Sequence, residues 1–157
     1  MRQGIKWGMI AAVTAAALSI GGAVVAQDKS AVLKERQNLM DGQATDLKPI
    51  QAFAKGDGEQ GPALVAAMDL LSRSPKIVGL FPPGTSSTDF PGKTNAKPDI
   101  WQNWDKFSAI PPALHGEEEK LVDAIKSGDR KATGDQLAAA GKAGCGPCHG
   151  TFREKMS

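Results

Sequence analysis

The chain has 157 residues, with 19 basic and 17 acidic side chains and a formal net charge of +2 at neutral pH. This length suits one domain, or one domain and a targeting segment. The basic residues are not clustered, so the charge pattern excludes the electrostatic footprint of a nucleic-acid-binding protein.

The first 26 residues resemble a secretory signal peptide. Arg2 and Lys6 supply a positive start, the run 10–20 is apolar, and 23–26 offers small residues for cleavage after Ala26. A retained membrane anchor is the alternative, but the apolar run is alanine-rich and only weakly hydrophobic. We therefore predict that residues 1–26 are removed, and that residues 27–157 form one domain in the periplasm.

Removal of this leader changes the charge of the molecule. The leader contains two of the 19 basic residues and none of the 17 acidic ones, so the mature chain has a formal charge of zero. The sequence pI of about 8.6 is thus a property of the precursor. We expect no nucleic-acid partner and no stable membrane span after processing.

The pattern becomes helical at Ser30, a candidate N-cap, and Gly56 is a candidate stop. Pro49 falls inside this stretch and predicts a kink or a split of the helix. A buried arginine on this helix needs an anion. One face is formed by side chains at spacings of three and four, namely Leu33, Arg36, Met40, Gln43, Leu47, Ile50 and Ala54.

A second helix is predicted from Gly61 to Ser72, with Pro62 in its first turn. We expect Leu64, Met68 and Leu71 to form its inward stripe. A short apolar segment, 77–80, follows the helix. A loop from Phe81 to Lys97, rich in Pro, Gly, Ser and Thr, comes next.

The third helix is predicted to begin at Pro98 and to carry Ile100, Trp101, Trp104 and Phe107 on one side. Pro111-Pro112 and Gly116 interrupt the pattern, which resumes at Glu117, so a continuous helix across this region is not expected. A turn at Gly128-Asp129 leads to a fourth helix from about Arg130 to Phe152. With no period-two pattern in the sequence, these segments predict an all-α, antiparallel four-helix bundle.

The most specific motif is Cys145-Gly146-Pro147-Cys148-His149, near the C-terminus. Cys-x-x-Cys-His is the signature for covalent attachment of a c-type haem. Cysteines three apart lie on nearly the same face of a helix and can both reach one porphyrin edge. The adjacent histidine can then bind the iron. We predict one haem c in this position.

Three other interpretations of the motif are weaker. A thioredoxin-like dithiol would sit after a strand and before a helix in a βαβ pattern, but only nine residues follow Cys148. A zinc site needs further Cys or His ligands, and His115 is the only other histidine. A disulfide between Cys145 and Cys148 would leave His149 without a role.

The chain resembles the class II cytochromes c, meaning cytochrome c-prime and its low-spin relatives. The haem motif at the end of the last helix is one shared feature, and the segment 36–40, with an arginine four residues before Met40, is a second. The stretch 92–101 resembles the family's entry into the third helix, and Arg153 matches a basic position near the proximal histidine. The resemblance spans residues 27–157.

The resemblance implies a role for each of seven residues. Cys145 and Cys148 hold the haem, and His149 is the proximal ligand. Met40 faces the opposite side of the iron, as a sulfur ligand or as packing. Arg36 binds a haem propionate, which is a bidentate anion partner for its guanidinium. Phe81 lines the pocket, and Arg153 lies near His149. Plain core packing for Met40 and a solvent-directed side chain for Arg36 remain the alternatives.

Two departures from a regular bundle accompany the resemblance. Gly146-Pro147 is a poor helical pair, so the last helix is expected to be distorted where it presents His149. Pro111-Pro112 puts the family's subunit packing in doubt. His115 is expected to be exposed in a polar turn and not to be an iron ligand.

The function expected from these residues is electron transfer, without enzymatic activity, between periplasmic redox partner proteins. The alternative is a five-coordinate, high-spin haem protein that binds small gases such as NO or CO. A thiol oxidoreductase is a remote third interpretation. Homodimer formation is a further expectation, although the outer face of the first helix is polar.

Overall fold

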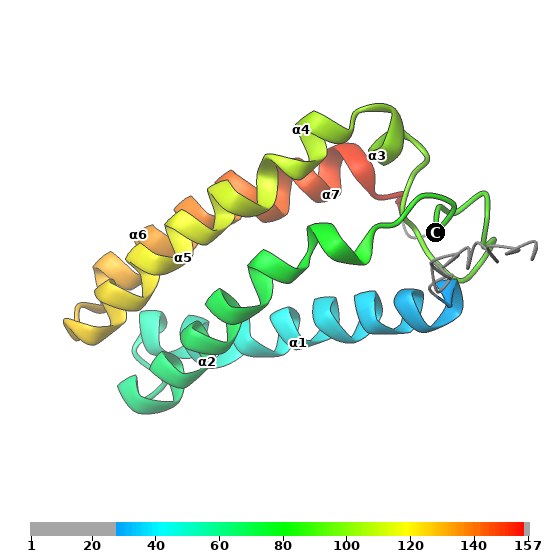
Figure 1. Cartoon of the computed structure of the whole chain (residues 1–157). Coiled ribbons are helices and arrows are strands. Elements are labelled where there is room, and N and C mark those ends of the chain that lie inside the picture. Colours follow the sequence, from blue (N-terminus) through cyan, green and yellow to red (C-terminus); the bar gives the residue numbers. More distant parts are fainter. Residues whose placement is uncertain (1–27, 156–157) are drawn as a thin grey trace, which may run out of the picture.

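The computed structural model describes residues 28–155 (Figure 1). The predicted signal peptide lies outside the described residues. Within them the structure contains helices and one isolated bridge between Ala96 and Arg153, and no strand. The all-α, four-helix prediction is thus confirmed. The long helices are α1 (Lys29–Lys55), α2 (Gln60–Arg73), α5 (Ile110–Lys126) and α6 (Arg130–Ala140) with its continuation α7 (Gly146–Phe152).

Helix α1 has a capping residue at each end, Asp28 and Gly56. The N-cap is Asp28 and not Ser30, because the Asp28 carboxylate accepts a hydrogen bond of 2.9 Å from the Ser30 backbone N–H. Gly56 ends the helix at φ 97°, a conformation that favours glycine, and its N–H bonds back to Phe53. The predicted stop is confirmed, and the predicted start was two residues late.

Pro49 does not split α1, which continues unbroken to Lys55. Ile50 and Phe53, immediately after the proline, are both buried in the core. Burial of two large side chains stabilises the second half of the helix by more than one lost backbone hydrogen bond costs. Of the predicted kink or split, the split is wrong for this reason.

Helix α2 turns a face of small residues inward. Ala63, Ala67 and Leu70 are buried, whereas Met68 is 55% exposed. The predicted stripe of Leu64, Met68 and Leu71 was therefore rotated about the helix axis. Alanines on the inner face allow α2 to approach α1 and α5 closely, and both helices pack against it.

The proline-rich region breaks earlier than predicted. Short helices α3 (Asp99–Gln102) and α4 (Trp104–Ser108) come first, and α5 then runs without interruption through Gly116. Pro111 and Pro112 occupy the first turn of α5, where a missing backbone N–H costs nothing. The prediction that Pro111-Pro112 and Gly116 interrupt the helix was wrong, because the prolines start it.

The last helix is distorted at the haem motif, as expected. A π-helical turn, η3 (Gly141–Cys145), separates α6 from α7, and Pro147 lies in the first turn of α7. The wider turn accommodates a ring that would clash in a regular α-helix. Cys145 therefore ends the π turn, while Cys148 and His149 lie on α7.

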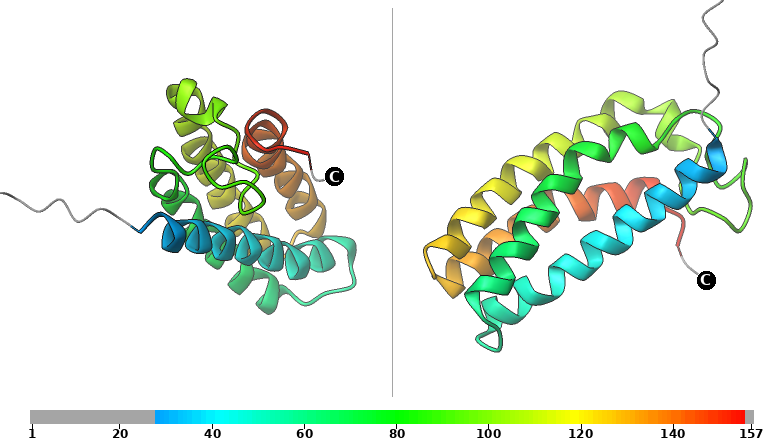
Figure 2. Two further views of the ribbon diagram at one scale, coloured as in Figure 1. Left: turned by 90° about the vertical axis from the view of Figure 1, so that its right-hand side faces the viewer. Right: turned by 60° about the horizontal axis from the view of Figure 1, so that its bottom comes forward.

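The bundle contains two hydrophobic cores. In Figures 1 and 2 the turns that join α1 to α2 and α5 to α6 lie at one end of the bundle, and loop 81–97 lies at the other. One core surrounds Ile50, Phe53, Leu121 and Ile125, near the turns that join α1 to α2 and α5 to α6. The other lies near loop 81–97 and the C-terminal end, and includes Leu39, Leu80, Phe81, Ile100, Phe107, Leu114 and Phe152. Among the described helices, none is both long enough and apolar enough to cross a membrane.

Candidate haem site

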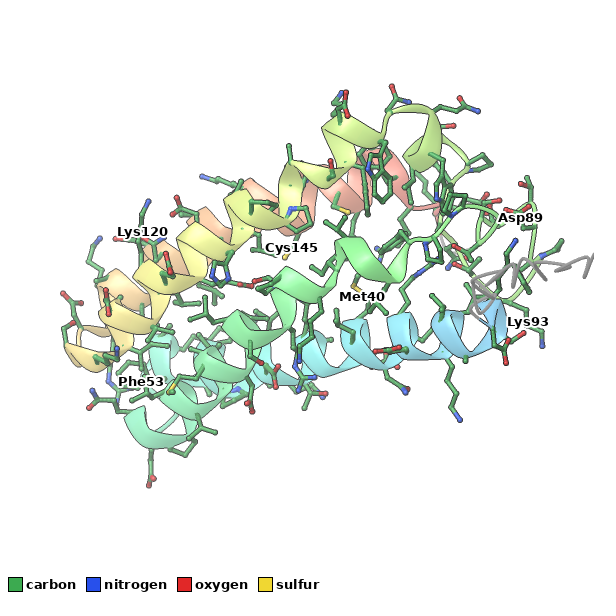
Figure 3. All side chains as sticks on the ribbon, in the orientation of Figure 1. Met40, Phe53, Asp89, Lys93, Lys120 and Cys145 are labelled. Atoms are coloured by element: carbon green, nitrogen blue, oxygen red, sulfur yellow. The ribbon has the colours of Figure 1, made fainter. Side chains whose placement is uncertain are left out.

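A large crevice lies beside the second core, between α1, loop 92–96 and α7. Its volume is about 740 Å³, within the range of cofactor sites. Met40 and Cys145 both point into the interior from opposite helix pairs (Figure 3). The lining contains all seven residues singled out in the sequence, namely Arg36, Met40, Phe81, Cys145, Cys148, His149 and Arg153.

The two cysteines are free thiols with raised pKa values. Burial, helped by the proximity of Cys145, raises the pKa of the Cys148 thiol to about 11. Burial and the charge of Glu118 raise the pKa of Cys145 as well. A redox dithiol needs a lowered pKa and a helix N-terminus after a strand. These cysteines have raised pKa values, and the helix that they begin follows the π turn η3 and not a strand, so their environment does not match that of a redox dithiol.

His149 follows Cys148 on the same helix and is suited to bind a metal. Burial, together with the charge of Arg153, lowers the pKa of His149 below its ordinary value. The lowered pKa favours the neutral imidazole, which is the form that ligates iron. Arg153 follows the last residue of α7, and Ala96 of the loop pairs with it as an isolated bridge.

Met40 lies on the α1 wall of the crevice and is partly buried against the second core. Phe81 is 6% exposed, and its ring centroid lies 4.8 Å from that of Phe107, with the two rings tilted by 60°. Both residues are where the sequence predicted them, at the crevice, and their contacts with haem stay predictions. Met40 is the only thioether among the lining residues.

Arg36 is fully enclosed, with 5% of its surface exposed. Its guanidinium donates to the carbonyls of Leu80 (2.9 Å) and Thr85 (3.1 Å), and to the hydroxyls of Thr85 (2.6 Å) and Thr94 (3.3 Å). The plane also covers the Phe81 ring at 4.0 Å. Four of its five N–H groups are thus used within the chain. One N–H group of Nη2 remains, so Arg36 can give a haem propionate one hydrogen bond, and the bidentate pair that the resemblance implied is wrong.

His115 lies within α5 and not in a polar turn, so the expected turn was wrong. Its Nδ1 is 3.0 Å from the Ser74 hydroxyl, and it does not line the crevice. In the part of the chain that the structure describes, no three Cys, His, Asp or Glu side chains cluster as a metal site. The zinc interpretation therefore has no support in residues 28–155.

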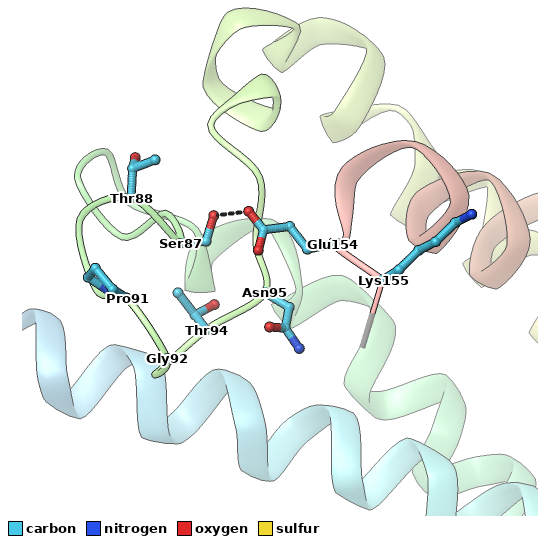
Figure 4. A pocket seen from close by; sticks show the side chains of 8 residues that line it. All are labelled: Ser87, Thr88, Pro91, Gly92, Thr94, Asn95, Glu154 and Lys155. Atoms are coloured by element: carbon cyan, nitrogen blue, oxygen red, sulfur yellow. Dashed lines mark hydrogen bonds between the residues drawn. The ribbon is translucent and has the colours of Figure 1, made fainter. Parts of the chain in front are cut away.

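A second hollow of about 490 Å³ lies on the other side of loop 81–97 (Figure 4). Ser87 donates a hydrogen bond of 2.5 Å to Glu154 there, which ties the loop to the C-terminal segment. Its lining is polar and contains no Cys, His or Met. The cofactor therefore belongs in the larger crevice, not in this hollow.

Sequence reasoning missed several wall residues of the crevice. Phe107 and Phe152 face each other edge-on at 5.5 Å and close its inner side. Phe107 was placed on an apolar stripe but not at the cofactor. Gln43 and Leu47 continue the Arg36–Met40 face by one and two helical turns, and that spacing was the available signal.

These residues define the class of the protein. Two cysteines, a neutral histidine and an apolar crevice of suitable size fit a covalently attached haem in a four-helix bundle. A sequence model of the cytochrome c′ family matches residues 31–153. The chain belongs to the cytochrome c′ family, and it carries one c-type haem.

Known relatives agree over most of the chain. It is 26% identical over 145 residues to the cytochrome c′ of Rhodospirillum rubrum, covering 88% of this chain and 92% of that one. Cytochrome c-556 of Agrobacterium tumefaciens is 26% identical over 125 residues, covering 78% and 97%. A Rhodobacter cytochrome c′ structure has a TM-score of 0.74 at 30% identity, covering 82% of this chain and 99% of that one.

Proposed function

We propose that this chain is a periplasmic electron carrier, with His149 and Met40 as the axial ligands of its haem iron. The observation that carries the proposal is the position of Met40, on the α1 wall of the crevice that also contains His149. Bound haem would supply a one-electron couple whose potential is raised by His/Met ligation. Electron transfer requires no general acid, general base or nucleophile, so we assign no enzymatic activity to the chain.

The side chains have separate tasks in this proposal. Neutral His149 binds the iron from α7, and Met40 offers sulfur from α1. Phe107 and Phe152 exclude water from the inner wall, which limits reorganisation when the charge changes. Lys93 and Arg153, at the mouth of the crevice, supply positive charge toward the propionates and toward an acidic partner surface.

A second function is favoured if Met40 only packs in the crevice. Three compared structures are nitric oxide complexes of cytochrome c′ variants from Alcaligenes xylosoxidans, each at 22% identity to this chain. If Met40 does not ligate, the apolar wall of the crevice leaves a sixth position for a diatomic gas. Gas binding is therefore the alternative function.

The Met40→Ala substitution distinguishes the two functions. If Met40 ligates, the oxidised wild-type spectrum is low-spin with a weak sulfur-to-iron band, and the variant is high-spin. Carbon monoxide should then bind the variant readily and the wild type slowly. A wild-type spectrum that is already high-spin and unchanged by the substitution contradicts ligation and favours gas binding. Met68→Ala, on the exposed face of α2, is the matched methionine control.

A further inference from the structure

Glu118 is a buried carboxyl group that the haem site does not explain. It lies on the inner face of α5 between Leu114 of one core and Leu121 of the other, and only 1% of its surface is exposed. Neither carboxylate oxygen has a hydrogen-bond partner of standard geometry. An ionised carboxylate in such a place costs several kcal/mol unless it is paired or protonated.

A polar path connects this buried group with the surface. The Ser74 hydroxyl is close enough to Glu118 to offset part of its desolvation. Ser74 itself is fully buried, and its Oγ is 3.0 Å from Nδ1 of His115. The His115 side chain is 36% exposed, and its Nε2 lies 3.9 Å from the exposed Glu119 carboxylate. Serine and histidine can both accept and donate a proton, so the series can conduct one.

The other end of the path reaches the haem attachment point. Helix α5, which carries Glu118, packs against η3, which ends at Cys145. The charge of Glu118 also raises the pKa of the Cys145 thiol. Cys145 bonds to the porphyrin in the loaded protein. The charge on Glu118 and the charge on the haem iron therefore act on each other through a dry, weakly screening interior.

Among residues 28–155, no basic side chain forms an ion pair with Glu118. Burial raises its pKa to about 7, and Ser74 is the one opposing influence. Two cations on helices that pack against α5 have other partners: Arg73 of α2 pairs with Asp46 at 2.8 Å, and Lys131 of α6 pairs with Asp135 at 2.6 Å. The remaining ionisable residues on α5 and on the elements that pack against it are Asp69, Lys76, Asp105, Lys106, Glu117, Glu119, Lys120, Asp123, Lys126, Arg130, Lys142 and Cys145.

We propose that Glu118 is a redox-linked proton site, protonated when the haem is reduced, with Ser74 and His115 as its connection to solvent. Reduction adds one electron from an external one-electron donor and removes one positive charge from the iron. The carboxylate at Glu118 then takes one proton from solvent and forms a carboxylic acid. On oxidation, the haem gives up the electron and Glu118 releases the proton to solvent. The inference requires only a redox-active haem and holds whether or not Met40 ligates.

The test is a spectroelectrochemical titration of the haem-loaded protein over a pH range centred on neutrality. The wild-type midpoint potential should fall as pH rises through this range, since deprotonation opposes reduction. A tenfold higher proton affinity in the reduced state corresponds to a total fall of about 59 mV for a one-electron couple. Glu118→Gln should abolish this component, and Glu119→Gln should retain it.

The propionates contribute equally to both variants, so the difference between the two curves isolates Glu118. A Glu118→Gln holoprotein with an unchanged pH slope would overturn the proposal. If this variant yields no holoprotein, the redox-difference infrared spectrum of the wild type decides. A carboxylic-acid C=O band that appears on reduction supports the proposal, and its absence overturns it.

The connection to solvent has its own readout. Ser74→Ala and His115→Asn should keep the pH-dependent amplitude and slow the proton uptake that follows rapid reduction. Equal rates in wild type and both variants would remove Ser74 and His115 from the inference. The Met40→Ala spectrum tests iron ligation and does not depend on Glu118. Failure of the proton-site proposal can therefore be told apart from failure of the proposed His149–Met40 ligation.

Discussion

Arg36 joins the crevice wall to loop 81–97 at the scale of a single residue. Its four hydrogen bonds reach Leu80, Thr85 and Thr94, and burial lowers its pKa to about 10, so it stays charged at neutral pH. Without this side chain, buried carbonyls and hydroxyls would lose their donor. The residue therefore stabilises the loop first, and a propionate contact comes in addition.

Arg36→Leu should destabilise the protein by about 3 kcal/mol or more, because each buried polar group left unpaired costs about 1–3 kcal/mol. Urea unfolding of the haem-loaded protein measures this loss. Gln37→Leu is the control: Gln37 also bonds the loop, at 2.8 Å to Lys93, but this bond is exposed. Equal unfolding midpoints for the two variants would contradict the structural role. A lower midpoint potential in Arg36→Leu alone would indicate the predicted propionate contact.

The identity of the site residues could be predicted from the sequence, but not all of their contacts. Cys145, Cys148 and His149 are adjacent in sequence, so their spacing alone defines the haem motif. The partners of Arg36 are 44 to 58 residues away, and no local pattern indicates them. Glu118 was missed although it lies three residues before Leu121, on the same helix face, and that spacing was a usable signal.

At the scale of elements, the π turn η3 determines how α7 presents the haem motif. Gly144 is buried within it, and an added Cβ would lie 2.6 Å from Cβ of Leu114 on α5. This contact is too short for two methyl-sized groups. The close approach of α5 and η3 therefore requires glycine at this position.

Gly144→Ala should destabilise the protein by about 1–3 kcal/mol through overpacking. Gly141→Ala is the matched control in the same turn, since a Cβ there meets no atom within 4 Å and the backbone is helical at φ −59°. That change should stabilise the turn by about 0.5–1 kcal/mol. Thermal unfolding of both holoproteins checks the opposite signs. A destabilised Gly141→Ala would show that the π turn itself requires glycine.

The boundaries of helices were less predictable than their number. Proline disrupts a helix that precedes it but is well tolerated in the first turn of a helix that follows. Whether Pro111 ends a helix or starts one therefore depends on where α4 ends, which the local sequence does not show. Pro49 was overruled by the burial of Ile50 and Phe53. The rotation of α2 could not be predicted, because Ala63 and Ala67 carry too little hydrophobic signal to compete with Met68.

At the scale of the whole molecule, export and haem attachment predict the mass of the mature protein. Cleavage after Ala26 leaves residues 27–157, whose acidic and basic residues balance. Intact-mass spectrometry of periplasmic material should show this chain plus one haem that resists acid–acetone extraction. A chain that retains residues 1–26 would contradict removal of the leader. The Cys148→Ser substitution should remove one thioether bond and lower the yield of holoprotein substantially.

Burial of one acid within the bundle also makes the stability of the whole molecule depend on pH. Desolvation raises the pKa of Glu118 from 4.5 to about 7, so the folded state holds a proton that the unfolded state has already released between these values. Stability is therefore highest below pH 4.5 with respect to this group, and it falls as pH rises to about 7. The full difference is of the order of 3 kcal/mol.

Glu118→Gln should remove this loss, because the amide has nearly the same shape and never ionises. Relative to the wild type, the variant should gain stability progressively as pH rises from 4.5 to about 7, and the gain should then remain constant. Urea unfolding of the oxidised holoproteins at a series of pH values gives the difference curve, in which His149 and the propionates cancel. Glu119→Gln, at a side chain 63% exposed, should give a flat difference. A flat curve for Glu118→Gln as well would mean that the folded protein pairs or hydrates this carboxylate. The energetic basis of the redox-linked proton site would then be lost.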